Sequence, residues 1–447
     1  MNGTVGAAGA QREGSTSAAT SSTSPPVRTC DVLVVGGGPT GLFLACLLAG
    51  SGVDVQVLER RTVPSDHSRA IGLHPPAVAA LGRVGLADAA VAAGAPIRTG
   101  RARSRGRDLG DLHFARAWPG RPFVLSLPQS RTEALLEQRL AQLAPRALHR
   151  GRDVTALRQR AGGVEVTAHS PGGDVHWRAR VVVGADGTRS NVRDLLGVGT
   201  TTLAHADTYL MGDFSDPGVQ TSGGVRDDQE AVIHLEPAGV VESFPLPGGR
   251  RRWVAHTGSA PAPAPAAPSA ADLAAVVAHR TGTRLDAPSN SMISAFAVRT
   301  RIVRRMMTGR AVLIGDAAHE ISPIGGQGIT LGWLDALDLA PLLQDLVRRE
   351  RSSPFDAGGS FPLGAEGPLR AVRAFVDFER TRLRAARVAA RMAQLNMALG
   401  RPVPLPVGRT RDMLLRLLLR TPARHAMAWV YSMGWARSVG HERTTST

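Results

Sequence analysis

Three glycines and one acid near the amino terminus have the spacing of a dinucleotide-binding site. Gly36, Gly38 and Gly41 form a G-x-G-x-x-G pattern after the apolar run DVLVV. The first glycine permits a tight turn, the second lets the backbone approach a pyrophosphate, and the third lets the following helix pack closely on the strand. Glu59 ends the next apolar run, where a carboxylate can accept hydrogen bonds from ribose hydroxyls. The pattern predicts a bound dinucleotide without distinguishing FAD from NAD, and a merely tight turn is the alternative.

A second acid and a second glycine-rich segment occur much later in the chain. Asp316 follows the apolar run AVLIG, and ISPIGGQGI at residues 321–329 comes shortly after it. Ligands of α/β folds bind at the carboxyl ends of strands, so a carboxylate there can accept hydrogen bonds from a polyol. The N–H groups of the glycine loop suit an anionic or electron-rich group. The alternative is a glycine-rich turn after a buried strand.

Three separated segments resemble the fingerprints of the class A FAD-dependent monooxygenases, the aromatic-ring hydroxylase family of para-hydroxybenzoate hydroxylase. They are the first glycine pattern, VVVGADGTRSNVR at residues 181–193, and GDAAH with the GGQG loop at residues 315–328. The segments occur in the family's order. Asp186 and Gly187 match the Asp-Gly pair that serves both FAD and NAD(P)H binding in that family, whereas an isolated Asp-Gly is usually a turn. The resemblance covers residues 31–340, with FERTR at residues 378–382 as a weaker match.

The resemblance implies FAD-binding positions in all of these segments. Asp316 would bind the ribityl chain, and residues 323–328 would line the isoalloxazine ring. Arg69 matches an arginine that reaches the flavin or the pyrophosphate, and Gln129 matches a glutamine that contacts FAD. The full implied set consists of Gly36, Gly38, Pro39, Thr40, Gly41, Glu59, Arg60, Arg69, Gln129, Val154, Asp186, Gly187, Asp316, Pro323, Gly325, Gly326, Gln327, Gly328 and Ile329. No metal site is expected.

The sequence departs from the family pattern at positions that bear on catalysis. An Ile-Thr pair at residues 329–330 replaces the usual Met-Asn after GGQG. Thr330 can still hydrogen-bond, and an FAD contact near it is expected. The two tyrosines of the chain, Tyr209 and Tyr431, do not match the pair that deprotonates the phenol in para-hydroxybenzoate hydroxylase. No catalytic residue is therefore assigned. His319 and Pro323 are candidates in the flavin loop, and a hydrogen-bonded structural role is the alternative for the histidine.

The resemblance implies an FAD-dependent monooxygenase with NAD(P)H and O2 as co-substrates. A single dinucleotide fingerprint leaves NAD(P)H no permanent site, and in this family it binds transiently to reduce FAD. Reduced flavin then reacts with O2 to give a flavin hydroperoxide, which transfers one oxygen atom to an electron-rich substrate. The Ala, Leu and Val of residues 200–300 predict an apolar pocket for a phenolic, other aromatic or polyketide-type small molecule.

Three other functions stay open at this point. A flavin-dependent halogenase would share the first fingerprint, but its tryptophan-rich signature is missing. An FAD-dependent reductase or epoxidase of an isoprenoid or quinone precursor would bind the same cofactor. A non-catalytic flavin-binding protein is the contrasting class, and the intact cofactor loops argue against it.

Composition excludes several other classes of protein. The formal net charge is +16, yet the chain contains no lysine and its 53 basic residues are scattered arginines, which indicates GC-rich codon usage rather than a nucleic-acid surface. Cys30 and Cys46 are too few for a disulfide framework and predict buried thiols in a reduced cytoplasm. Residues 1–29 lack the apolar core of a signal peptide and predict a disordered leader. The longest apolar stretch is too short to span a bilayer.

The elements around these motifs predict an α/β fold. A Rossmann-type FAD-binding domain is expected to be interleaved with a β-rich substrate domain and followed by a helical C-terminus. The FAD-binding domain is expected in two stretches, residues 30–199 with some substrate-domain strands and residues 301–345. The substrate domain is expected at 200–300 between them, and helices are expected at 346–447 with a surface loop at 351–368. A Ser-x-x-Glu capping box at Ser130 and Glu133 predicts the start of a helix.

The C-terminal segment at residues 409–435 combines arginine with leucine, methionine and tryptophan. The first interpretation is a helical lid that packs on the core. The alternative is a peripheral membrane contact that admits a lipophilic substrate. The sequence does not indicate an oligomeric state.

Overall fold

The computed structural model describes residues 27–64, 70–116, 118, 120–160, 162–202, 207–216, 229–259, 268–351 and 369–436. Arg69, residues 1–26 of the predicted leader and residues 352–368 of the predicted surface loop lie outside these residues. Strand β1 (Val27–Val35) corrects the leader boundary, because residues 27–29 already belong to it. The reason is pairing: the parallel ladder with β11 (Val175–Gly184) extends back to Val27.

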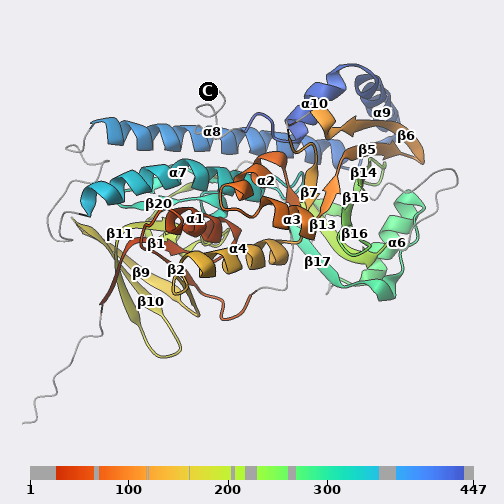
Figure 1. The fold of residues 1–447 in the computed structure, drawn as a ribbon. Coiled ribbons are helices and arrows are strands. Elements are labelled where there is room, and N and C mark those ends of the chain that lie inside the picture. Colours follow the sequence, from red (N-terminus) through yellow and green to blue (C-terminus); the bar gives the residue numbers. More distant parts are fainter. Residues whose placement is uncertain are drawn as a thin grey trace, which may run out of the picture.

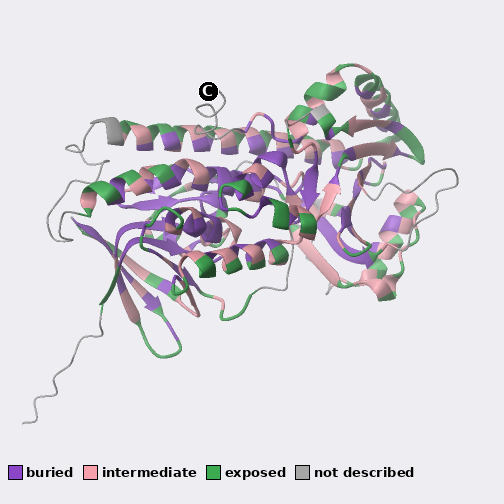
Figure 2. Ribbon diagram, viewed as in Figure 1, coloured by how far each residue is buried: buried purple, intermediate pink, exposed green. Residues whose placement is uncertain are grey.

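A mostly parallel sheet holds all three predicted FAD-binding segments (Figure 1). Its main path is β19 (Met307–Thr308), β20 (Ala311–Leu313), β11, β1, β2 (Val55–Glu59) and β8 (Leu148–Arg150). The antiparallel hairpin of β9 (Asp153–Arg160) and β10 (Gly163–His169) continues beside β11. Because β2, β1, β11 and β20 run parallel, their carboxyl ends meet at one edge. Their apolar residues are buried (Figure 2), as expected for parallel strands covered on both faces.

Helices from distant parts of the chain cover this sheet. They are α1 (Pro39–Ala49), α2 (Pro75–Gly82), α3 (Ala87–Ala93), α4 (Gln129–Leu143), α7 (Gly328–Glu350) and α8 (Leu369–Gly400). Helix α1 packs against α4 and α7, and the long α8 lies along α7 (Figure 1). Nε1 of Trp333 donates a hydrogen bond to the Pro39 carbonyl at 2.9 Å, and its ring centroid lies 5.0 Å from that of Phe43. This contact holds the start of α7 beside the start of α1.

The predicted capping box at Ser130 and Glu133 is wrong. Helix α4 begins at Gln129, so Ser130 lies inside its first turn and no side chain caps it. Glu133 accepts a hydrogen bond from Nε2 of Gln129 at 2.8 Å instead. A reciprocal capping box occurs at the start of α6 (Ala270–Thr281).

Seven strands form a second sheet, which is built from two separate regions of the chain. Its order is β17 (Met292–Ala297), β13 (Asp207–Ser215), β16 (Arg250–Ser259), β15 (Val241–Leu246), β14 (Glu230–His234), β5 (Thr99–Ser104) and β6 (Arg107–His113). Helix α6 packs on β13, β15 and β16, while α9 (Leu405–Arg420) and α10 (Ala423–Tyr431) pack on β6 (Figure 1). The α9–α10 pair therefore covers one end of this sheet, as a lid would.

Two small sheets and a short helix complete the described elements. One sheet contains β3 (Gly72–Leu73), β7 (Val124–Ser126) and β4 (Ala95–Ile97), and the other contains β12 (Thr200–Thr202), β18 (Arg301–Val303) and β21 (His319–Glu320). Helix α5 (Asn191–Leu195) follows β11. Within the described residues, no helix is long and apolar enough to cross a membrane, and no three His, Cys, Asp or Glu residues gather as metal ligands. Cys30 and Cys46 are buried free thiols.

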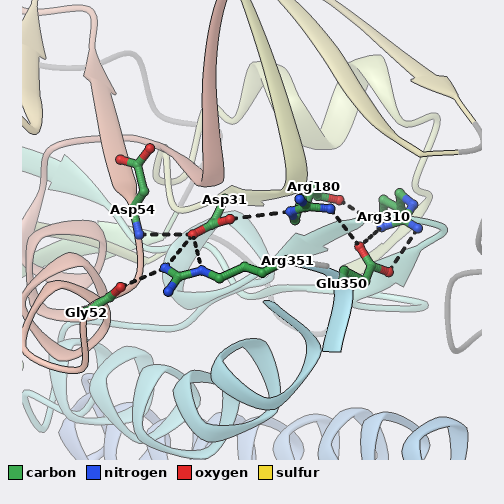
Figure 3. A network of polar contacts seen from close by, with 7 residues as sticks. All are labelled: Asp31, Gly52, Asp54, Arg180, Arg310, Glu350 and Arg351. Atoms are coloured by element: carbon green, nitrogen blue, oxygen red, sulfur yellow. Dashed lines mark hydrogen bonds and ion pairs between the residues drawn. The ribbon is translucent and has the colours of Figure 1, made fainter. Parts of the chain in front are cut away.

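A network of charged side chains joins β1 and β11 at the level where the neighbouring strands β2 and β20 begin (Figure 3). Asp31 of β1 accepts hydrogen bonds from Nε of Arg180 at 3.4 Å and from Nη2 of Arg351 at 2.8 Å. Arg310, just before β20, donates to both carboxylate oxygens of Glu350 at 3.0 and 3.1 Å. The network joins four segments that are far apart in the sequence, around Asp31, Arg180, Arg310 and Glu350, on the side of the sheet opposite the glycine loops.

Candidate active site

A cavity of about 750 Å³ is lined both by the predicted FAD-binding segments and by one face of the seven-stranded sheet. The predicted residues that line it are Gly36, Gly38, Pro39, Thr40, Glu59, Arg60, Gln129, Val154, Asp186, Gly187, Asp316, Pro323, Gly325, Gly326, Gly328 and Ile329. Gly41 and Gln327 are described but do not line it. The fold thus brings all three fingerprints to one space.

The first glycine loop meets the third fingerprint at the edge of the parallel sheet. Gly36 has a φ of +111°, and a Cβ there would lie 2.4 Å from the Ala185 carbonyl oxygen. A Cβ at Gly41 would lie 2.0 Å from the Gly36 oxygen, which explains why α1 requires glycine at that turn. At Gly38, by contrast, a Cβ would meet no atom within 4 Å. The backbone at the start of α1 is therefore open to the cavity, where a pyrophosphate fits its N–H groups.

Glu59 is held at the end of β2 by hydrogen bonds to its backbone surroundings. Its Oε2 accepts from the Gly37 N–H at 2.7 Å, and Oε1 accepts from the backbone N–H and Nε of Arg61, both at 2.9 Å. Burial raises the pKa of Glu59, but the hydrogen bonds and charge of Arg61 outweigh it and hold that pKa below its ordinary value. Glu59 is therefore an oriented carboxylate, able to accept from ribose hydroxyls.

Asp316 is a carboxyl group whose surroundings fit a ribityl chain. Its side chain is accessible from the cavity, and the cavity lies deep within the protein. This burial raises the pKa of Asp316 to about 6. No residue in the described part of the chain donates a hydrogen bond to this carboxyl. A polyol in the cavity would supply the missing donors, so the residues present fit FAD.

The glycine loop before α7 is held by a histidine that the sequence reasoning missed. Nε2 of His74 lies 2.7 Å from the carbonyl oxygen of Gly325, within a loop in which Gly325 and Gly326 have φ values of +96° and +65°. Burial lowers the pKa of His74 to about 4, so the ring is neutral and its Nε2–H donates to the carbonyl. Within the described chain, its buried Nδ1 has no partner. The sequence offers one sign of this role, because His74 lies in the same segment, SRAIGLHPP at residues 68–76, as the predicted Arg69.

His319 lies in a buried polar cluster behind the cavity and does not line it. Its Nε2 is 2.6 Å from Oδ2 of Asp335, which also accepts from the Gly315 N–H at 3.0 Å. Nε of Arg382, from the FERTR segment, donates to the other oxygen of Asp335 at 2.8 Å. Burial lowers the pKa of His319, but the charge of Asp335 raises it above the ordinary value. The geometry favours the structural role of His319 over a role in the flavin loop.

Asp186 lines the cavity and also makes hydrogen bonds to the following helix, while Thr330 faces away from the cavity. Oδ1 of Asp186 accepts from the Ser190 hydroxyl at 2.5 Å and Oδ2 accepts from the Val192 N–H at 3.1 Å, so this acid holds the start of α5. The side chain of Thr330 is fully buried and does not line the cavity, whereas Ile329 does. The start of α7 therefore points Thr330 into the core, and the FAD contact predicted near it is available through Ile329.

The other half of the cavity is largely apolar and is closed by the C-terminal helices. The sheet residues that line it include Ala102, Met211, Ala231, Ile233, Phe244, Val254 and Phe296. Leu415 and Leu419 of α9 and Tyr431 of α10 line it from the other side. The ring of Tyr431 stacks on Phe114 at 6.0 Å, and Tyr209 is buried without lining the cavity. These contacts favour the lid interpretation of the C-terminal segment.

Comparison with known proteins agrees with this geometry. The family model described as "FAD binding domain" matches residues 29–355. The chain is 33% identical over 408 residues to 6-methylpretetramide 4-monooxygenase of Streptomyces rimosus, covering 89% of this chain and 68% of that protein. It is 35% identical over 317 residues to rifampicin monooxygenase of Streptomyces venezuelae, covering 69% of this chain and 63% of that protein. The chain thus spans about two thirds of the length of these relatives.

Solved structures show the same architecture. The anhydrotetracycline hydroxylase from Streptomyces rimosus superposes with a TM-score of 0.70 at 29% identity, over 90% of this chain and 76% of that one. The p-nitrophenol 4-monooxygenase from Pseudomonas putida DLL-E4 gives a TM-score of 0.76 at 22% identity, over 90% and 98%, and this likeness concerns the fold alone. With its three fingerprints gathered around one cavity, the chain belongs to the FAD-binding family of class A flavoprotein monooxygenases.

Proposed function

We propose that the protein is an FAD-dependent monooxygenase that uses NAD(P)H and O2 to hydroxylate a phenolic or polyketide-type aromatic molecule. The observation that carries the proposal is the shared cavity, in which cofactor loops and an apolar sheet face line the same space. The names of the relatives and structural neighbours, which include monooxygenases of tetracycline-type compounds, support an aromatic polycycle as the substrate class.

Each cofactor-side residue has a defined task in this proposal. The open backbone at Gly38 and the start of α1 would bind the pyrophosphate, and Glu59 would accept from the adenosine ribose. Asp316 would accept hydrogen bonds from the ribityl hydroxyls, and residues 323–328 would lie along the flavin ring. FAD would supply the two-electron chemistry that activates O2, which no side chain of a protein can provide.

The apolar half of the cavity orients the substrate and keeps water away. Aliphatic side chains on the sheet and on α9 offer a polycyclic ring apolar contact, which favours burial of the ring. Excluding water strengthens polar contacts in the cavity and suppresses side reactions of reactive oxygen species. The described chain carries one G-x-G-x-x-G unit, so NAD(P)H would bind transiently rather than at a second Rossmann site.

Oxygen labelling tests this function. Purified protein with FAD should oxidise NAD(P)H faster when a polycyclic phenol is present, and one ¹⁸O atom from ¹⁸O2 should enter the product. Stimulated oxidation with reduction of the substrate and no label would favour the reductase of an isoprenoid or quinone precursor. FAD binding without turnover by any reductant would favour the non-catalytic flavin-binding protein.

Membrane contact and location are secondary elements of the proposal. The outward face of α9 exposes Met413, Leu414 and Leu417 beside arginines, which supports a peripheral contact with an anionic bilayer. Co-sedimentation with phosphatidylglycerol vesicles should separate this contact from a simple lid, which would leave the protein in the supernatant. The buried free thiols of Cys30 and Cys46 fit the predicted cytoplasmic location.

A further inference from the structure

The apolar half of the cavity contains a carboxyl group at the centre of its sheet. Glu242 lies on β15, the middle strand of the seven, and its side chain lines the cavity. Its cross-strand neighbours are Ile233 on β14 and Val254 on β16. The next residues along the same row are Ala102 on β5 and Met211 on β13, which also line the cavity. Glu242 is thus an acid in the middle of an otherwise apolar row.

This carboxyl group has no partner in the described part of the chain. Glu242 is 8% exposed, and no described residue donates a hydrogen bond to it or forms an ion pair with it. The next row of the same sheet contains an acid with a partner, because Arg252 donates to both oxygens of Asp213 at 2.6 and 2.8 Å. A buried carboxylate without a donor is unfavourable. Burial raises the pKa of Glu242 to about 7, which is the consequence of that cost.

The two tyrosines of the chain lie within electrostatic reach of the same acid. Burial, and after it the charge of Glu242, raises the pKa of Tyr431 on α10 and of Tyr209 on β13. Both phenols therefore stay neutral, and neither donates a hydrogen bond to Glu242. The carboxyl faces a chamber that is large enough for a ring system and is bounded by aromatic and aliphatic side chains.

We propose that Glu242 is a specificity-determining residue that accepts a hydrogen bond from a hydroxyl group of the substrate. The inference rests on the proposed function in that it takes this cavity as the substrate site. The rings of the substrate contact the apolar residues beside Glu242 on the sheet. The substrate hydroxyl donates the hydrogen bond that no described residue donates to Glu242. Phenolic polycycles are therefore preferred over analogues of the same shape that lack the O–H.

A matched pair of probes tests this preference without relying on turnover. Equilibrium dialysis measures binding of 1-naphthol and of 1-methoxynaphthalene, whose ether oxygen cannot donate, to the FAD-loaded protein. At about pH 8, where Glu242 is mostly ionised and cannot donate to the ether oxygen, wild type should bind 1-naphthol more tightly by about 10- to 100-fold, the usual effect of a hydrogen bond to a charged group. Glu242→Leu should bind the two probes alike. Glu242→Gln keeps an acceptor oxygen without the charge and should show an intermediate preference.

The control is another buried acid of the same half of the molecule. Glu236 is 5% exposed, accepts from the Arg105 N–H at 2.9 Å and does not line the cavity. Glu236→Gln should keep the wild-type preference for 1-naphthol. Glu242 forms no hydrogen bond or ion pair with a described residue, so both of its variants should keep the wild-type near-ultraviolet circular dichroism. If Glu242→Leu does not fold, the probe preference of Glu242→Gln tests the proposal.

The outcomes separate this inference from the proposed function. Equal binding of the two probes by wild type, binding of neither, or a full preference in the Glu242 variants would overturn the role of Glu242. A preference that depends on Glu242 in a protein that oxidises no NAD(P)H would contradict the proposed function alone. Oxygen insertion stimulated equally by hydroxylated and methylated substrates would contradict the role of Glu242 and leave the proposed function in place.

Discussion

Carboxyl groups at opposite ends of the parallel sheet have opposite surroundings, and Asp316 differs even from Glu59 and Asp186 at its own end, which both accept hydrogen bonds from the protein. At the amino-terminal end, Asp31 and Glu350 each accept hydrogen bonds from arginines of other segments (Figure 3). At the carboxyl-terminal end, Asp316 faces the cavity and receives no hydrogen bond from the described chain. The acids that are paired with arginines stabilise the fold, whereas the unpaired acid in the cavity is available to a ligand.

A third acid, Asp335, is paired like Asp31 but lies close to Asp316, where it supports the edge of the cavity. Asp335 is fully buried behind Gly315, bound to His319 and Arg382. It holds the strand end from which Asp316 projects, although it does not touch the cavity itself. Loss of the buried pair of Asp335 and Arg382 should therefore lower stability, whereas removal of the unpaired Asp316 should weaken binding.

The largest effect should come from breaking the buried cluster. Arg382→Ala leaves Asp335 buried without its arginine, and removal of one partner of a buried ion pair costs about 3–5 kcal/mol of stability. Denaturant unfolding followed by circular dichroism measures this loss. Arg380→Ala is the matched control on the same helix, because Arg380 pairs with Asp377 at the surface and should contribute less than about 1 kcal/mol. Equal losses for the two variants would contradict the assignment of the cluster as structural.

Removing the unpaired acid should weaken cofactor binding rather than the fold. Under the proposed function, Asp316→Ala deletes a carboxylate that would accept hydrogen bonds from the ribityl chain, which should raise the dissociation constant for FAD by about 10- to 100-fold. Fluorescence titration of the apoprotein with FAD measures the change. The unfolding midpoint of the apoprotein should not fall, because no protein hydrogen bond is lost. Unchanged FAD affinity would show that this end of the sheet is not a cofactor site.

Glu242 makes the stability of the protein depend on pH. Its folded-state pKa of about 7 lies above the ordinary value of 4.5, so the folded protein favours the protonated acid and loses stability as the pH rises from about 4.5 to 7. Glu242→Gln removes this loss. The variant should therefore match wild type near pH 4.5 and exceed it by on the order of 3 kcal/mol above pH 7. Denaturant unfolding at both pH values measures it, and a constant difference would contradict the buried, unpartnered carboxyl.

The smallest effect should come from the network at the other end. Arg351 is half exposed, and its bond to Asp31 should contribute less than about 1 kcal/mol. Arg351→Ala should lower stability by that amount and leave the dissociation constant for FAD unchanged. A tenfold loss of FAD affinity in this variant would erase the distinction between the two ends of the sheet.

Sequence patterns predicted the cofactor half well because its strands and turns are determined by residues that are close together in the sequence. Continuous apolar runs mark the parallel strands, and the glycines of the first loop are needed where Gly36 and Gly41 approach other backbone atoms. His74 was missed because its role depends on a contact with Gly325, far along the chain. The capping box at Ser130 failed because the helix begins two residues earlier than that box requires, with Pro128 in place of Ser130 at the N-cap.

The substrate half was less predictable because its chemistry depends on tertiary contacts. Glu242 occurs in the run VVESFPL, where an acid in a short strand usually faces solvent. Only the pairing of β15 between β14 and β16, with α9 and α10 over the sheet, buries it. The same applies to α9, whose leucines face the cavity on one side and solvent on the other.

The uptake of FAD by the purified protein tests the central claim most directly. If the three fingerprints converge on one cavity, the apoprotein should bind one FAD per chain, turn yellow and gain thermal stability, and Asp316→Ala should need far more FAD to do so. A folded, homogeneous preparation that retains no FAD once unbound cofactor has been removed, whatever FAD concentration was added, would contradict the account.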